Sequence, residues 1–194
     1  PLSFHPIALI FGLLSFVSYL VEGAVGDWSA LYLFEDKGIV IEEAVMGVML
    51  FNGTMCIGRL LGNRLGKHLT SKQVVVGGYL LGSIAMGLIV FLPGHASMYT
   101  YLLLGISLAM IVPNLFSAMG EQNVIPMTQA VATSTMLGYM GILMGPALIG
   151  FIAHGTSLTV AFIVLTTLLV VSAGIGKYAY HLMSKDCGLS EEQI

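Results

Sequence analysis

The chain has 194 residues, of which 57% are hydrophobic and 9% are charged, and its mean hydropathy is +0.93. A soluble domain carries about 25% charged residues, so this composition excludes a soluble globular protein and predicts an integral membrane protein. The formal net charge is −3, and no run of Lys and Arg suggests a nucleic-acid-binding surface. The chain begins with Pro1 rather than Met, so we expect it to be part of a longer protein.

Six apolar runs are long enough to cross about 30 Å of hydrocarbon, and they predict an all-α integral membrane domain over residues 1–183. The predicted spans are 6–33, 44–61, 73–92, 96–119, 124–153 and 157–180, followed by a cytoplasmic tail over 184–194. The third span of each triplet is the most apolar, which is typical of a three-plus-three inverted repeat. The two triplets show no residue-level similarity, so polarity alone indicates the repeat.

Lys and Arg residues predict the orientation, because cytoplasmic loops of membrane proteins are enriched in them. Six spans place the second connection and both termini on one face, and this face carries six of the seven basic residues. They are Arg59, Arg64, Lys67, Lys72, Lys177 and Lys185. We therefore expect a multi-pass protein of a bacterial inner (plasma) membrane with both termini in the cytoplasm.

Polar side chains concentrate in the first, second, fourth and fifth spans. Charged and amide side chains are costly in hydrocarbon, and those within membrane spans usually face a cavity or another helix. We expect these four spans to line a polar interface while the third and sixth face lipid. The predicted cavity and substrate-binding residues are Tyr19, Glu22, Asn52, Asn114 and Tyr139.

The segment VEGAVGDWSA, residues 21–30, places two carboxylates and a tryptophan in the first span. In an upright helix beginning near Pro6, Glu22 lies roughly 24 Å along the axis, past the midplane. Flanking glycines could loosen the helix there, so Glu22 is the cavity candidate, with structural hydrogen bonding as the alternative. Asp27 and Trp28 are expected at the outer boundary, where tryptophan is enriched, with gating as the alternative role.

The segment Asn63-Arg64-Leu65-Gly66-Lys67-His68 follows the second span and resembles the Asp-Arg-x-Gly-Arg-Arg loop of the major facilitator superfamily (MFS). This loop joins the second and third helices of each six-helix half in that family. Asn63 stands where the family has an acid and brings no charge. The resemblance gives Asn63 and Arg64 a structural or gating role, and Arg59 is expected to reach towards the inner surface with a structural role.

The fifth span contains GYMGILMGPALIG, in which Gly141, Gly145 and Pro146 resemble the glycine-proline motif of the fifth helix of facilitator halves. Glycines at four-residue spacing form a flat helix face for close packing, and proline bends the helix. The stretches EGAVGDWSALYL, from Glu22, and PNLFSAMGEQ, from Pro113, resemble the fucose-permease-like branch. The resemblance covers essentially the whole chain and implies helices seven to twelve of a twelve-helix transporter.

This resemblance implies the carboxy-terminal domain of a secondary transporter that moves a small polar, sugar-like solute by alternating access. The expected partners are the lipid bilayer, an amino-terminal six-helix half, the solute and, as a further candidate, a coupling proton. The alternative is a six-helix binding or scaffold protein that acts as a homodimer without transport. No metal-ligand spacing, phosphate loop or catalytic constellation is visible, so we expect no enzyme, no metal, no cofactor and no nucleic acid.

Overall fold

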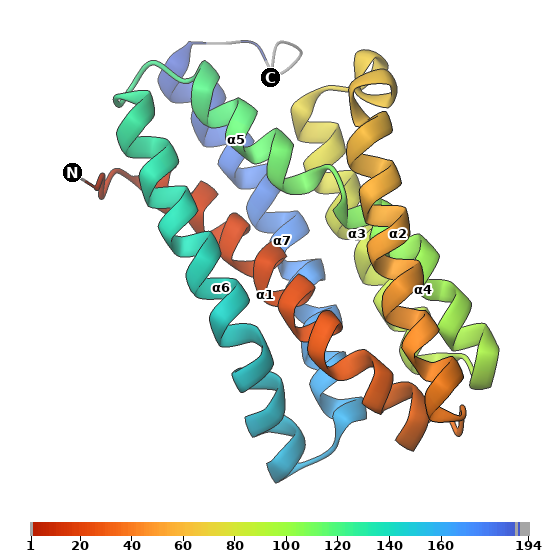
Figure 1. Cartoon of the computed structure of the whole chain (residues 1–194). Helices are drawn as coiled ribbons and strands as arrows, with labels where there is room; N and C mark the ends of the chain where they lie inside the picture. Colours follow the sequence, from red (N-terminus) through yellow and green to blue (C-terminus); the bar gives the residue numbers. More distant parts are fainter. Residues whose placement is uncertain (1, 189, 191–194) are drawn as a thin grey trace.

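The computed structural model of the chain describes residues 2–188 and 190, apart from the side chains of Asn63 and Leu65. It is an all-helical bundle (Figure 1). The helices are α1 (Pro6–Glu35), α2 (Ile41–Leu65), the short 3₁₀ helix η1 (Gly66–His68), α3 (Ser71–Phe91), α4 (Gly94–Leu108), α5 (Ile111–Glu121), α6 (Met127–Gly155) and α7 (Leu158–Cys187). Six helical segments are long and apolar enough to cross a membrane, which confirms the predicted fold class.

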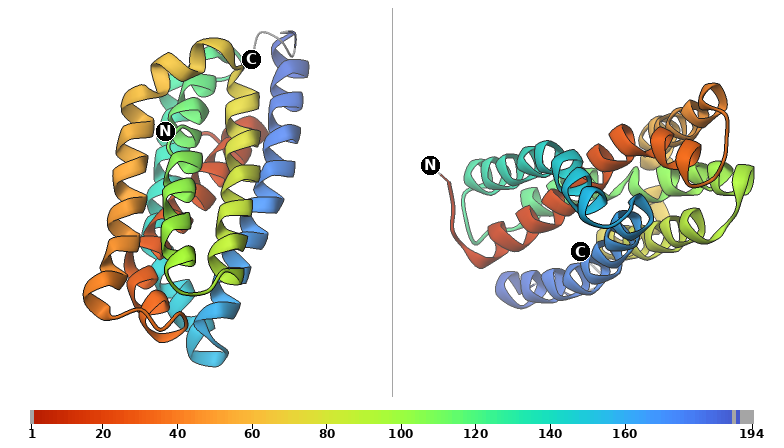
Figure 2. Two further views of the ribbon diagram at one scale, coloured as in Figure 1. Left: turned by 90° about the vertical axis from the view of Figure 1, so that its right-hand side faces the viewer. Right: turned by 90° about the horizontal axis from the view of Figure 1, so that it is seen from below.

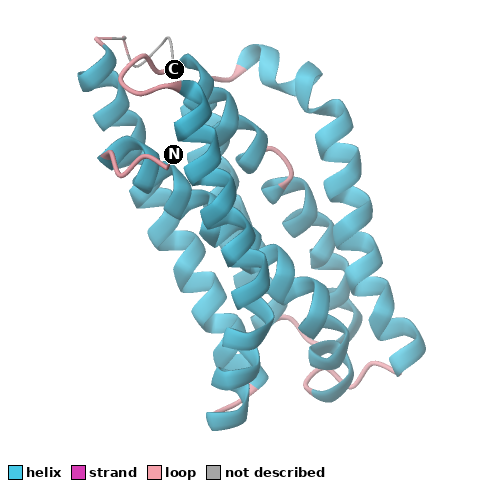
Figure 3. Ribbon diagram, turned by 60° about the vertical axis from the view of Figure 1, so that its left-hand side comes forward, coloured by secondary structure: helices cyan, strands magenta, loops and turns pink. Residues whose placement is uncertain are grey.

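The helix ends follow from local sequence. The Oγ1 of Thr70 accepts a hydrogen bond from the Gln73 amide while the Gln73 side chain accepts one from the Thr70 amide, which forms a capping box at the start of α3. Ser157 caps α7 more simply, since its side-chain oxygen accepts a hydrogen bond from the Val160 amide. These caps keep the connections short, and the helices pack side by side in the coloured secondary-structure view (Figure 3).

The fourth predicted span is two helices rather than one, because the helix is interrupted at Ala109 and Met110. Pro113 lies in the first turn of α5, where its missing amide hydrogen costs least, but in a continuous helix its ring would clash with the Ala109 carbonyl. The amide of Asn114 resumes the helix by donating to the Met110 carbonyl at 3.2 Å. The expected span 96–119 therefore contains a break that hydropathy does not reveal.

Two helix pairs organise the bundle. Helix α1 packs along α6 and also touches α2 and α7, whereas α3 packs on α7 and α4 (Figure 2). Helix α1 has 30 residues, about 45 Å at the usual rise, and it crosses the other helices obliquely (Figure 1). A helix longer than the hydrocarbon thickness can be accommodated by tilting, so α1 is long enough to cross a bilayer at an angle.

Buried tyrosine hydroxyls link α3 to α1 and α7 to α3. The Tyr79 hydroxyl on α3 lies 2.7 Å from the Ser18 Oγ and donates to the Leu14 carbonyl at 2.7 Å, both on α1. The Tyr180 hydroxyl on α7 lies 2.7 Å from the Ser71 Oγ at the start of α3. A buried hydroxyl without a partner is costly, so these bonds also fix how the helices are rotated against one another.

Most helix boundaries differ from the expected spans by a few residues, and the start of α6 and the end of α7 illustrate the differences. Helix α6 begins at Met127 rather than at 124, because Gln122 organises the preceding turn. Its Oε1 accepts from the Val124 and Ile125 amides, and its Nε2 donates to the Ile125 carbonyl. Helix α7 continues to Cys187, so the first residues of the expected tail are helical.

Candidate functional site

An ion pair joins the first two membrane helices. The Arg59 Nη2 on α2 donates to the Glu22 Oε2 on α1 across 3.3 Å. Neither side chain is fully buried, since 42% of the Arg59 side chain and 23% of the Glu22 side chain remain exposed. The pair therefore lies on an open side of the bundle, where a solute can reach its polar atoms.

Two tyrosines extend this group onto α6. Tyr19 precedes Glu22 by one helical turn, and its ring stacks on that of Tyr139 with centroids 6.3 Å apart and planes 7° from parallel. Tyr139 is 62% exposed, so one face of this aromatic pair is accessible. The structure thus brings three predicted residues, Tyr19, Glu22 and Tyr139, together with Arg59 into one group, which we call the α1–α2–α6 cluster.

The two amide candidates lie differently. Asn52 is exposed on α2 and precedes Arg59 by two turns, which places both on the same side of that helix, about 10.5 Å apart along its axis. Asn114 is half-buried and its Nδ2 donates to the Met110 carbonyl at 2.8 Å. The amide of Asn114 therefore satisfies a backbone group at the break between α4 and α5.

A seam of glycines holds α6 against α1. A Cβ atom on Gly141 would lie within 2.2 Å of the Phe16 carbonyl oxygen, and one on Gly145 within 2.4 Å of the Leu20 carbonyl oxygen. Cβ atoms never approach other heavy atoms so closely, so the two backbones are in direct contact at these residues. This seam places the cluster, because Phe16 and Leu20 flank Tyr19 on the same helix.

Trp28 closes the end of the same seam that lies away from the α2–α3 loop. Its Nε1 donates to the Pro146 carbonyl at 2.9 Å. A Cβ added to Gly150 would lie 2.9 Å from the Trp28 ring, so the ring packs directly on this glycine. Asp27, the neighbouring residue, is exposed. Trp28 also borders an open pocket of about 490 Å³ between the ends of α1, α6 and α7.

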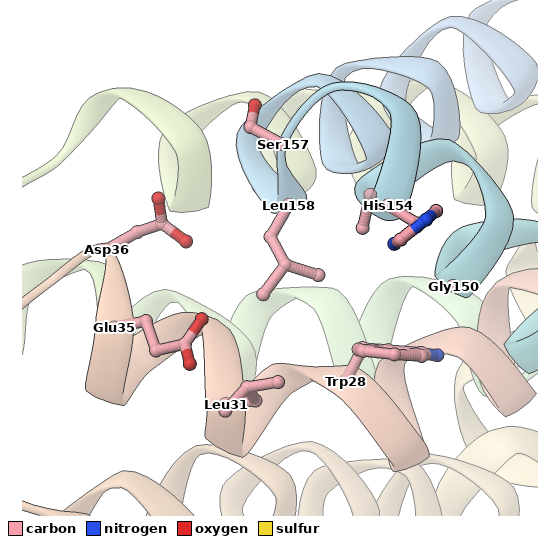
Figure 4. Close-up of a pocket in the computed structure, with 9 residues that line it drawn as sticks. Trp28, Leu31, Glu35, Asp36, Gly150, His154, Ser157 and Leu158 are labelled. Carbon is pink, nitrogen blue, oxygen red and sulfur yellow. The ribbon is translucent and has the colours of Figure 1, made fainter.

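Figure 4 shows this pocket, in which Glu35 and Asp36 from the end of α1 lie across from His154 at the end of α6. All three are exposed. Among the described residues no group of three or more His, Cys, Asp or Glu side chains could hold a metal ion. The pocket is a polar vestibule at the end of the bundle that lies away from the α2–α3 loop.

The facilitator-like loop is only partly described. The Asn63 side chain lies outside the described residues, and Arg64 is exposed at the end of α2. Arg59 has a carboxylate partner in the membrane span, Glu22, that sequence reasoning did not assign. The oblique path of α1 and the length of the arginine side chain bring together two residues whose helices run in opposite directions.

Lys37 is a second residue that sequence reasoning missed. Its Nζ donates to the Val90 carbonyl at 2.6 Å and to the Leu92 carbonyl at 2.9 Å, and it lies 5.4 Å from the centroid of the Tyr32 ring. It thus supplies donors to the last carbonyls of α3, which have no intrahelical partner. Partial burial lowers the pKa of Lys37, and the charge of Asp36 opposes that shift.

Comparison of the sequence with known proteins finds a similar bacterial transporter and a similar bacterial membrane protein. No protein-family model matches the chain. It is 41% identical over 168 residues to an MFS-type transporter of Yersinia pestis, covering 85% of this chain and 43% of that protein. It is 30% identical over 170 residues to the membrane protein MosC of Rhizobium meliloti, covering 86% and 42%. The chain therefore spans less than half the length of the curated relatives it matches.

Solved structures of low sequence identity share the fold. A peptide transporter POT in complex with alafosfalin superposes with a TM-score of 0.79 at 13% identity, covering 94% of this chain and 39% of the transporter. The same transporter in complex with sulfate gives a TM-score of 0.74 at 15% identity, covering 95% and 39%. The chain is thus a multi-pass membrane protein that has the fold of part of a transporter and is similar in sequence to a bacterial MFS-type transporter.

Proposed function

We propose that the chain is the carboxy-terminal six-helix half of a major-facilitator secondary transporter, and that the α1–α2–α6 cluster binds its solute. The observation that carries this proposal is the ion pair between Glu22 and Arg59, which lies within membrane spans yet stays exposed. Charged side chains inside membrane spans are rare and mark substrate or ion pathways.

The pattern of burial supports a missing partner over the same open side. In the most apolar stretch of each span, 61% of α1 is buried, but only 28% of α2 and 22% of α6. Helix α6 exposes a methionine-rich face, with Met136, Met140 and Met144 all at least 40% exposed. An amino-terminal half placed against α2 and α6 would cover these faces and enclose the cluster, and rocking of the halves would give alternating access.

The chemistry of the cluster fits a small polar solute. A carboxylate and a guanidinium supply acceptors and donors, Asn52 adds an amide on the same side of α2, and the Tyr19–Tyr139 pair offers an aromatic surface. Pockets for small molecules combine apolar walls with a few placed polar groups in this way. We therefore propose a neutral, hydroxyl-rich solute of the sugar class, with Glu22 as the candidate carrier of a coupling proton.

The distribution of basic residues supports the orientation. The α2–α3 turn, the start of α1 and the end of α7 lie towards one end of the bundle (Figure 1). Arg64, Lys67 and Lys72 belong to that turn and its flanks, and cytoplasmic segments are enriched in such residues. We propose that this end faces the cytoplasm of a bacterial cell and that the pocket bordered by Trp28 opens on the outer side.

Uptake by the complete reading frame reconstituted in vesicles tests the proposal. With a panel of radiolabelled monosaccharides, Glu22→Gln and Arg59→Gln are each expected to lower uptake at least about tenfold, which corresponds to about 1.4 kcal/mol. Glu42→Gln, an exposed carboxylate at the start of α2, is the control and should retain uptake. Unchanged uptake in both cluster variants would remove the pair from the mechanism, and absence of any uptake would favour the homodimeric scaffold.

A further inference from the structure

A second polar pocket lies on the opposite side of the bundle, between the start of α3 and the last turns of α7. It has a volume of about 300 Å³ and is lined by Lys72, Gly174, Lys177, Tyr178 and His181. Helices α3 and α7 are the pair predicted to face lipid, and they pack against each other along their length (Figure 2). This pocket shares no residue with the α1–α2–α6 cluster or with the outer vestibule.

The spacing of the lining residues explains why they converge. Gly174, Lys177, Tyr178 and His181 follow the i, i+3, i+4, i+7 pattern, so they form one stripe on α7. Lys72 is the second residue of α3, and the bond between Ser71 and Tyr180 holds the start of α3 against α7. The pocket is therefore a fixed meeting point of two helices.

Basic side chains from both helices line the pocket. Two lysines and a histidine line it, and the positive end of the α3 dipole lies beside it because α3 begins at Ser71. Within the described part of the chain, the acidic residues at this end are Glu121, which ends α5, and Asp186. On an ideal helix Asp186 lies about 130° around α7 from the centre of the stripe, so it points away from the pocket.

Lys72 and His181 each have another interaction within the chain, and the inference does not require either to be unpaired. Lys177 is exposed and lies on the stripe between Gly174 and Tyr178. Gly174 leaves the floor of the pocket open, since a Cβ there would meet nothing within 4 Å. The pocket thus combines an open floor with an accessible cation, which is the chemistry that receives a phosphate group.

An apolar surface continues from this pocket along the same two helices. Exposed apolar side chains on α7 include Ile163, Val170 and Val171, and those on the neighbouring α3 include Leu80 and Ile84. Tyr178 is 59% exposed at the level of the pocket, as expected for an aromatic residue at a membrane interface. A ligand with a phosphate group and long acyl chains would match both the basic pocket and the apolar surface.

We infer that the pocket of Lys72, Lys177 and His181 binds the headgroup phosphate of an anionic phospholipid from the cytoplasmic leaflet, with the acyl chains against α3 and α7. Basic pockets between membrane helices on the cytoplasmic side bind anionic headgroups in this manner. The inference rests on the proposed orientation of the chain but not on transport, so lipid binding and solute uptake fail independently.

Native mass spectrometry of the complete reading frame in detergent tests this inference, with phosphatidylglycerol and phosphatidylcholine as the probes. We expect preferential retention of phosphatidylglycerol, and a loss of about fivefold in its affinity for Lys177→Gln, as each cation near the surface contributes about that factor. Lys177→Arg should restore the preference. Lys67→Gln, an exposed lysine of η1 outside the pocket, is the matched control and should bind like the unmodified protein.

A variant that fills the pocket but keeps its cations tests whether lipid binding requires the open space as well as the charge. Gly174→Leu keeps every cation but fills the open floor, and should lose the preference without loss of folding, since the position is unobstructed. Gly77→Leu on α3, where a Cβ also meets nothing within 4 Å, should keep it. Equal binding of both lipids by the unmodified protein, an unaltered preference in both Lys177→Gln and Gly174→Leu, or displacement of the lipid by millimolar inorganic phosphate would overturn the inference.

Discussion

The α1–α6 and α3–α7 pairs are built from similar apolar sequence but pack by different means. Between α1 and α6 the backbones touch, and an added Cβ on Gly141 or Gly145 would meet carbonyl oxygens at less than 2.5 Å. Between α3 and α7 a Cβ on Gly176 would lie 3.6 Å from the Val76 side chain, which is ordinary contact. Glycine in a membrane helix is thus a structural requirement in one pair and a tolerated residue in the other.

The two helix pairs also differ in the side chains that they expose. Helices α1 and α6 carry the polar cluster, and close backbone contact leaves Tyr19, Glu22 and Tyr139 on the exposed edge of the seam. Helices α3 and α7 bury their hydroxyls instead and expose aliphatic side chains. Without a hydrophobic driving force between helices in lipid, both solutions depend on close packing and interhelical hydrogen bonds.

Replacing one glycine by alanine in each helix pair gives the largest expected difference in stability. Gly141→Ala should destabilise the protein by about 3 kcal/mol or prevent folding, because its Cβ would displace the backbone of α1. Gly176→Ala should leave stability unchanged or raise it by up to about 1 kcal/mol, since alanine favours a helix and has room. Thermal unfolding of the two variants in detergent makes the measurement. Equal stabilities would show that the two seams do not differ.

Removing a buried hydroxyl should weaken the α3–α7 pair less severely. Tyr180→Phe deletes the partner of the Ser71 hydroxyl at a position only 1% exposed, with an expected cost of about 1–2 kcal/mol. Tyr178→Phe, two residues earlier and exposed, should cost less than about 0.5 kcal/mol. Chemical unfolding curves compare the two. A Tyr178→Phe variant as unstable as Tyr180→Phe would contradict the importance of the buried bond.

A substitution at the Trp28 end of the α1–α6 seam should lower the stability by about 1 kcal/mol. Trp28→Phe removes the donor to the Pro146 carbonyl and keeps an aromatic ring beside Gly150. Because this contact lies past the glycine seam, the loss should be smaller than for Gly141→Ala. The same unfolding assay tests it, with Phe34→Leu, an exposed apolar residue of the same helix, as the control. A loss of stability comparable to that of Gly141→Ala would mean that the contact at Trp28, rather than the glycine seam, mainly holds the pair together.

The smallest expected effect lies outside both pairs. Glu43 and His95 approach within 2.7 Å in the first turns of α2 and α4, with more than half of each side chain exposed. Glu43→Gln should change the stability by less than about 0.5 kcal/mol, as exposed ion pairs contribute little. Its change in stability is the baseline for judging the effects of Gly141→Ala, Tyr180→Phe and Trp28→Phe. An effect above 1 kcal/mol would mean that the loops, rather than the two seams, limit stability.

The six-helix fold could be predicted because hydropathy records length and burial along a membrane helix. The break at Ala109 and Met110 could not, since Pro113 is compatible both with a kinked helix and with the first turn of a new one. The start of α6 at Met127 was also missed. The side-chain amide of Gln122 forms hydrogen bonds with four nearby backbone groups, and hydropathy does not report such local bonds.

Part of the candidate site could be predicted from residue type and depth. Tyr19, Glu22 and Tyr139 were singled out because polar groups in a span need a partner, and the structure places them together. Their partner Arg59 was assigned to the inner surface instead. Finding it requires the tilt of α1 and the rotation of α2, which are set by packing between helices and not by either sequence segment alone.

Trp28 has a spectroscopic consequence. It is the single tryptophan of these 194 residues, and its indole joins α1 to α6 next to an open vestibule. Its emission wavelength and its quenching by iodide therefore report the separation of these two helix ends without any attached label. A red shift on adding a solute would mean that the seam opens there, and a constant spectrum would mean that α1 and α6 move as one rigid body.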